Sequence, residues 1–114
     1  MFKISQNESY FWPVEVHMAT DGGKFIKQTF DAEFRRISED RKKEISAEII
    51  AENPTLTARA LCNEVLVGWK GVEDEGSELP FSAVNLETML NISGVESAVT
   101  SAFFDSLTGG KRKN

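Results

Sequence analysis

The sequence has a single cysteine, Cys62, and a single histidine, His17, among its 114 residues. One cysteine excludes a disulfide within the chain, and no CxxC motif or His/Cys cluster has the spacing of a metal site. No hydrophobic run approaches the ~20 residues that a membrane-spanning helix needs. The N-terminus also lacks the basic, apolar and small-residue pattern of a secretory leader. We therefore expect a protein of the reducing cytoplasm, with no metal and no membrane segment.

Basic residues are outnumbered by acidic ones, 13 against 18, which gives a net charge of -5. This balance argues against a nucleic-acid-binding protein, because such proteins attract phosphates with clustered lysine and arginine. The length suits one domain, which we place at residues 1–110, followed by a flexible basic tail at residues 111–114. Eight Phe and two Trp supply bulky side chains for a core or for contacts with a partner.

No set of residues has the pattern of a catalytic site. His17 lies beside Glu15 on the polar side of an expected strand, and Cys62 lies on an expected helix with no histidine near it in sequence. One acidic cluster lacks the alternating oxygen ligands of a calcium loop and is better explained as a solvated turn: Glu73, Asp74, Glu75 and Glu78. We therefore predict no catalytic residues, no cofactor and no metal.

Two runs with a two-residue hydrophobic period, residues 11–19 and 24–34, predict an antiparallel hairpin. Between them, Asp21-Gly22-Gly23 is a turn signal, because glycine adopts positive φ without steric cost. A two-residue turn would mix the two faces of the hairpin, so we expect a three-residue loop. This register pairs Met18 with Ile26, Val14 with Phe30, and Trp12 with Ala32.

The rest of the chain has helical periodicity. Ser38 is the expected N-cap of a first helix, whose apolar face comprises Ile37, Ile45, Ile49 and Ile50. Asn53-Pro54 ends it, and Thr55 is the expected cap of a second helix that runs to about Leu66.

The end of this second helix is ambiguous, because Val65, Val67 and Trp69 alternate as in a short strand. Two more helices are predicted, residues 83–91 after Ser82 and residues 95–107 after Gly94. The predicted fold is α+β, an N-terminal antiparallel hairpin packed on a small bundle of about four helices.

The polar connection at residues 68–80 and the Phe that follows it contain unexpectedly bulky groups. Trp69 stands between two glycines, and Phe81 directly precedes an expected helix. These rings either fix the connection onto the core, with Phe81 packed against Leu86, or form a docking patch. The candidate partner-binding residues are Trp69, Val72, Leu79 and Phe81.

Both ends of the chain resemble tail assembly chaperones of long-tailed, lambda-like phages and related prophages. In the C-terminal half the resemblance lies in the run 66–72, the run 79–82 with Asn85-Leu86, and a terminal helix opened by Gly94-Val95. In the N-terminal half it lies in Pro13-Val14, the run 21–24, and the runs 29–30 and 34–36. The middle, residues 37–62, has only a generic helical pattern.

The resemblance implies a non-catalytic protein of the host cell cytoplasm. It would bind the long tape measure protein, keep it soluble while the tail tube forms, and be absent from the mature virion. The resemblance also implies a longer form made by ribosomal frameshifting, which would recruit the tail tube protein. Gly110-Lys111 is a dipeptide that a slippery site can encode. Self-association is compatible with this function. The alternatives are a structural tail or head-tail connector subunit retained in the virion, and a small regulatory protein that binds a bacterial target.

Overall fold

The first two strands form a long antiparallel hairpin. We describe residues 1–109 from a computed structural model of the chain, in which β1 (Ser9–Thr20) pairs with β2 (Lys24–Arg35) along its whole length. The loop between them is the three-residue turn η1 (Asp21–Gly23), and both of its glycines have positive φ, 80° at Gly22 and 78° at Gly23. The predicted register is confirmed: Met18 lies opposite Ile26, Val14 opposite Phe30, and Trp12 opposite Ala32.

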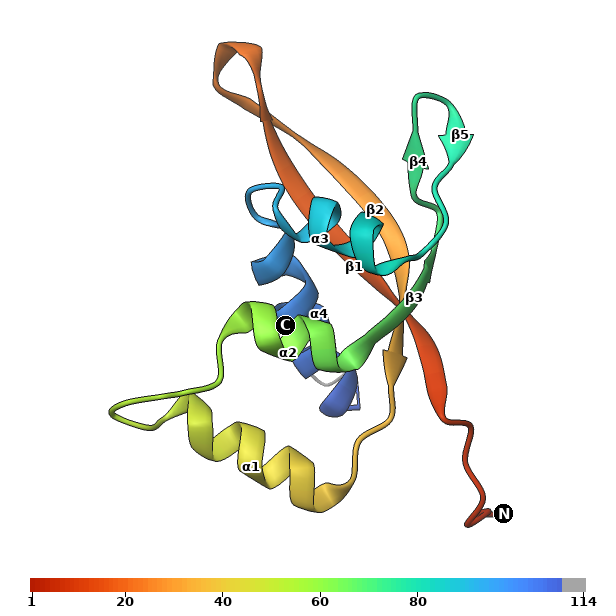
Figure 1. Cartoon of the computed structure of the whole chain (residues 1–114), viewed down its shortest axis with the longest axis vertical. Helices are drawn as coiled ribbons and strands as arrows, with labels where there is room; N and C mark the ends of the chain where they lie inside the picture. The colour runs from red at the N-terminus through yellow and green to blue at the C-terminus, as the bar shows by residue number, and fades with distance from the viewer. Residues whose placement is uncertain (110–114) are drawn as a thin grey trace.

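The helices cover one face of this hairpin over its open half. Val14, Phe30 and Phe34 are buried there, as their alternation predicted. The closed end projects beyond the helices as an arm (Figure 1). Ile26 belongs to the same alternating set, yet it is 48% exposed, because its part of β2 extends past the core.

A third strand joins the sheet. The helix α2 (Ala58–Val65) ends one residue before the expected boundary, and the chain continues directly into β3 (Leu66–Lys70). This strand pairs antiparallel with β2 over Asp31–Phe34, which gives the sheet order β1-β2-β3. A side chain at Gly68 would collide with the carboxylate of Glu33, which would have to move. The alternation at Val65, Val67 and Trp69 therefore did indicate a strand.

The first helix is capped as predicted but buries less than expected. In α1 (Glu39–Ile49) the Ser38 side chain accepts a hydrogen bond from the Arg41 main chain, 3.0 Å. Ile45 is buried, whereas Ile49 and Ile50 are exposed, Ile50 by 84%. The predicted apolar face was wrong at these two positions, because the helix ends there and the chain turns away.

The cap of the second helix also differs from the prediction. Thr57, and not Thr55, is the N-cap of α2, and its hydroxyl accepts from the Ala60 main chain at 3.0 Å. The Thr55 main chain instead donates to the carboxylate of Glu48 at 2.8 Å. Thr55 is therefore bound by a side chain of α1 and does not cap α2.

Two further helices complete the α+β fold. Ser82 caps α3 (Ala83–Leu90), and Gly94, with φ 91°, opens α4 (Val95–Leu107). The core of the sheet and the helices centres on Phe34 and Phe103, whose rings meet edge to face at 5.2 Å. The described residues thus contain the predicted hairpin and four helices, together with β3 and a small hairpin of β4 (Glu73–Asp74) and β5 (Ser77–Glu78). The expected tail at residues 111–114 and Gly110 lie outside the described residues.

Two carboxylates between the helices predict a loss of stability in acid. Arg41 donates two hydrogen bonds to Glu64, of 2.8 and 2.7 Å, and these hold the pKa of Glu64 below its ordinary value of 4.5. The main-chain N–H groups of Leu56 and Thr55 lower the pKa of Glu48 in the same way. Because both pKa values are lowered by folding, the stabilisation is present above about pH 4.5 and is lost as the pH falls through the folded values.

We therefore expect the free energy of unfolding, measured with urea across an acid pH series, to decline below about pH 4.5. The Glu64→Gln variant should show a flatter decline, because it removes one of the two groups that take up a proton on unfolding. An equally steep decline in Glu64→Gln would contradict this assignment.

Candidate binding groove

Trp69 lies on β3 and is 8% exposed. Its indole Nε1–H donates to the main-chain oxygen of Leu79 at 2.8 Å. Its ring meets the ring of Phe81 edge to face at 4.9 Å and that of Phe30 at 6.5 Å. Trp69 therefore joins the two ends of the connection between β3 and α3 and ties both to β2.

Val72 and Leu79 lie at the base of the β4–β5 hairpin. The chain leaves β3 at Gly71, where φ is 81°, and the Leu79 N–H donates to the Val72 carbonyl at 2.8 Å. At the tip, Glu75 and Gly76 both have positive φ, 52° and 83°, as a two-residue type I′ turn requires. Residues 73–78 thus project as a second, short arm (Figure 1).

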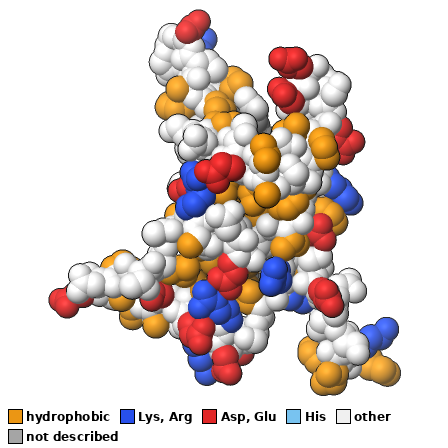
Figure 2. All heavy atoms as spheres, in the orientation of Figure 1, with side chains coloured by type: hydrophobic (Ala, Val, Ile, Leu, Met, Phe, Trp, Pro, Cys, Tyr) orange, Lys and Arg blue, Asp and Glu red, His pale blue; other side chains and the backbone are white. Residues whose placement is uncertain are grey.

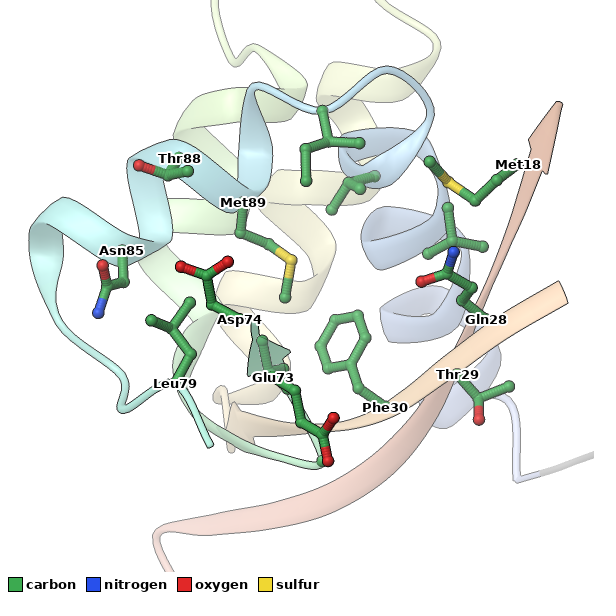
Figure 3. Close-up of a pocket in the computed structure, with 15 residues that line it drawn as sticks. Met18, Gln28, Thr29, Phe30, Glu73, Asp74, Leu79, Asn85, Thr88 and Met89 are labelled. Carbon is green, nitrogen blue, oxygen red and sulfur yellow. The ribbon is translucent and has the colours of Figure 1, made fainter. Parts of the chain in front are cut away.

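A groove of about 420 Å³ lies between the two arms and α3. The long arm, residues 17–28 of the β1–β2 hairpin, forms one wall, and the short arm, residues 73–78, forms the other (Figure 3). Phe30 and Met89 point into the groove in Figure 3 from β2 and α3. The apolar residues that line it are Val16, Met18, Phe30, Val72, Leu79, Met89, Ile92 and Val95.

The four candidate residues from the sequence fall into two pairs. Val72 and Leu79 line the groove, whereas Trp69 and Phe81 do not and instead support it from beneath. Packing of Phe81 against Trp69 brings the two predicted rings together, although they are twelve positions apart in sequence. The structure therefore brings all four residues to one region but places only Val72 and Leu79 in the lining of the groove.

Sequence reasoning missed the opposite wall and part of the floor of the groove. Met18 comes from the long arm and Met89 from α3, and they are the two methionines of the chain apart from Met1. Methionine is flexible and polarisable and is common on surfaces that accept varied apolar partners. The sequence signal was present in this pair, but 71 positions separate the two residues, and only the fold shows that they share a surface.

The short arm is strongly acidic. Glu73 and Asp74 line the groove, and residues 73–78 carry four carboxylates and no basic side chain. Glu73 lies directly opposite Glu78 across the two strands, and like charges in such a pair destabilise the pairing. Figure 2 shows the acidic side chains on this arm, above the hydrophobic atoms of the cleft between the arms. The groove therefore combines an apolar floor with one negative wall.

Other residues considered for chemistry lie outside this groove. His17 is exposed on β1, and Cys62 is buried in α2, where burial raises the pKa of its thiol to about 11. Such a thiol is protonated at neutral pH and is a poor nucleophile. Within residues 1–109 no three His, Cys, Asp or Glu side chains gather in a way that could hold a metal ion.

The same described residues include no helix long and apolar enough to cross a membrane. The longest of the helices, α4, has only 13 residues.

Comparison with known proteins gives one family assignment. A family model described as YdaY prophage protein matches residues 23–106, from the end of η1 to near the end of α4. No curated protein matches the chain, and no solved structure does. The description of the family places the chain in a prophage and is silent on tail assembly. Because the match covers well over half of the sequence, the chain belongs to the YdaY prophage protein family.

Proposed function

We propose that this prophage protein is a non-catalytic tail assembly chaperone, which holds apolar segments of the tape measure protein in the groove between its two arms. The observation that carries the proposal is the groove itself, an open apolar floor flanked by two projecting hairpins. The sequence resemblance to tail assembly chaperones and the prophage family support it.

The size and charge of the site suit a chaperone that must later be displaced. A groove of about 420 Å³ covers only a few side chains of a partner, so we expect each contact to be weak. Several copies along one long partner would still bind well together, because each added contact raises the effective local concentration of the next. The net charge of -5 keeps the bound complexes apart from one another.

We expect co-expression with the tape measure protein of the same prophage to move that protein from the insoluble to the soluble fraction. The Met89→Lys variant should lose most of this effect, because it places a charge on the floor of the groove. Val84→Lys is the matched control, since Val84 lies on the same helix, is 75% exposed and does not line the groove. The measurement is the soluble fraction of the tape measure protein on a blot, after confirming that both variants unfold like the wild type.

If both variants lose the solubilising effect on the tape measure protein equally, or if neither loses it, the groove is not the binding site. Purified mature virions distinguish the main alternative. We expect this chain to be absent from them, whereas a stoichiometric amount in finished tails would identify a structural tail or connector subunit. A longer frameshifted form that engages the tail tube protein remains part of the proposal, and the codons of Gly110-Lys111 test it directly.

A further inference from the structure

One edge of β2 has no partner over half its length. On one side β2 pairs with β1 from Lys24 to Arg35, but on the other side β3 accompanies it only over Asp31–Phe34. Beyond Lys70 the chain turns away at Gly71 and enters the short arm. Within residues 1–109, the position beside residues 25–29 of β2, where β3 would continue, therefore has no strand.

Pro13 shows which main-chain groups face this empty position. Pro13 has no N–H and lies opposite Asp31, so this pair is one whose main-chain groups point away from each other. Hydrogen-bonded and non-hydrogen-bonded pairs alternate along an antiparallel ladder, so every second residue of β2 from Asp31 behaves as Asp31 does. The N–H and C=O groups of Phe25, Lys27 and Thr29 therefore also point away from β1. Outside the ladder to β1, no main-chain hydrogen bond joins these three residues to another described segment.

This free edge forms part of the groove. Thr29 lines the groove, although its side chain lies on the other side of β2 from Phe30 (Figure 3). Its contribution to the wall is therefore its main chain. Opposite the edge stand Glu73 and Asp74, and beneath it lie the apolar side chains of Phe30 and Met89.

We propose that the groove binds its partner as an extended segment, which adds as a strand to the free edge of β2. This segment would carry apolar side chains at every second position, facing Phe30 and Met89, and a lysine or arginine beside Glu73 and Asp74. The inference rests on the proposed function in so far as the segment belongs to the tape measure protein.

Two features favour a strand over a helix as the occupant. The edge offers unpaired N–H and C=O groups, which a strand satisfies and a helix, already bonded internally, does not. A strand needs only about 4.8 Å beside its neighbour, whereas a helix with its side chains is about 10–12 Å across.

The charges and side chains of the groove indicate what the segment carries. A basic side chain on it would relieve the repulsion between Glu73 and Glu78, which lie directly opposite each other. The two methionines in the groove allow the apolar side chains to vary along the partner.

Synthetic peptides test the proposal without the tape measure protein. One peptide alternates valine with lysine and threonine, and a second has the same composition with the valines at helical spacing. Binding is measured by fluorescence anisotropy with the full chain. We expect the alternating peptide to bind at least about tenfold more tightly. Replacing its lysines with glutamates should weaken binding about fivefold, and Glu73→Lys with Asp74→Lys should reverse that preference.

A pair of proline variants tests the edge itself. Thr29→Pro removes an N–H that faces the groove and leaves the ladder to β1 intact, so it should weaken binding of the alternating peptide at least about tenfold. Glu15→Pro is the matched control, because Glu15 lies directly opposite Thr29 and its N–H faces the other edge of the sheet. Should Thr29→Pro fail to fold, amide hydrogen exchange on the wild-type chain gives a second measurement. The amides of Lys27 and Thr29 should become protected when the peptide binds.

The outcomes separate this inference from the proposed function. Equal or tighter binding of the helical-spacing peptide, or no protection of the Lys27 and Thr29 amides, overturns strand addition even if the chain still solubilises the tape measure protein. If the peptide adds as a strand to β2 but the chain is also found in mature virions, the inference is upheld and the proposed chaperone function is overturned. A wild-type dimer that Thr29→Pro converts to a monomer would assign the edge to a second copy of this chain and would also overturn the proposal.

Discussion

The Trp69→Ala variant is expected to lose about 3–5 kcal/mol of its free energy of unfolding. The indole is 8% exposed, touches the rings of Phe30 and Phe81, and donates a hydrogen bond to Leu79. Alanine would leave a large cavity between β2, β3 and the start of α3, and it would leave the Leu79 carbonyl without its donor. Equilibrium unfolding in urea, with the slope compared with that of the wild type, gives the change.

Phe25→Ala is the control for this measurement. Phe25 is also an aromatic residue of the sheet, but it is 68% exposed on the long arm, so its loss should change stability by less than about 0.5 kcal/mol. Phe81→Ala should fall between the two, because Phe81 is half-buried. If Trp69→Ala unfolds like the wild type and yet no longer binds the tape measure protein, Trp69 is part of the docking surface and its structural role is refuted.

The Phe34→Ala variant is expected to cost about 3–5 kcal/mol as well, for a different reason. Phe34 is fully buried at the end of β2 and meets the rings of Phe103 on α4 and Tyr10 on β1, at 5.2 and 6.1 Å. Its loss would separate the sheet from α4, whereas the loss of Trp69 would loosen the base of the short arm. A domain of this size is stable by only about 5–15 kcal/mol, so Phe34→Ala should be partly unfolded at 37 °C.

Circular dichroism against temperature, together with urea unfolding, measures this effect. Phe11→Ala is the matched control, because Phe11 lies on the opposite face of β1, is partly exposed and contacts only the ammonium of Lys70 at 4.0 Å among the described aromatic and cationic groups. We expect it to cost about 1 kcal/mol or less. A similar loss in both variants would mean that the two faces of the hairpin are equally important for stability, contrary to the observed burial.

The amino-acid sequence by itself determined the local features of the fold. The hairpin register followed from the alternation on either side of Asp21-Gly22-Gly23, because a slip of one residue would turn the buried side chains of β1 and β2 to the wrong face. The caps at Ser38 and Ser82 were predictable because a cap depends on hydrogen bonds within one turn of the same chain. Periodicity likewise placed Val95, Val99 and Phe103 on the buried face of α4.

Only the tertiary structure decided which of these features meet. The alternation around Trp69 suited either a helix end or a strand, and pairing with Asp31–Phe34 of β2 made it a strand. Ile26, Ile49 and Ile50 fit apolar patterns but are exposed, because burial depends on what another part of the chain places against them. The groove depends on the same kind of distant contact. Met18 and the free edge of β2 lie far in sequence from Met89 and from the acidic short arm, and folding brings all of them together.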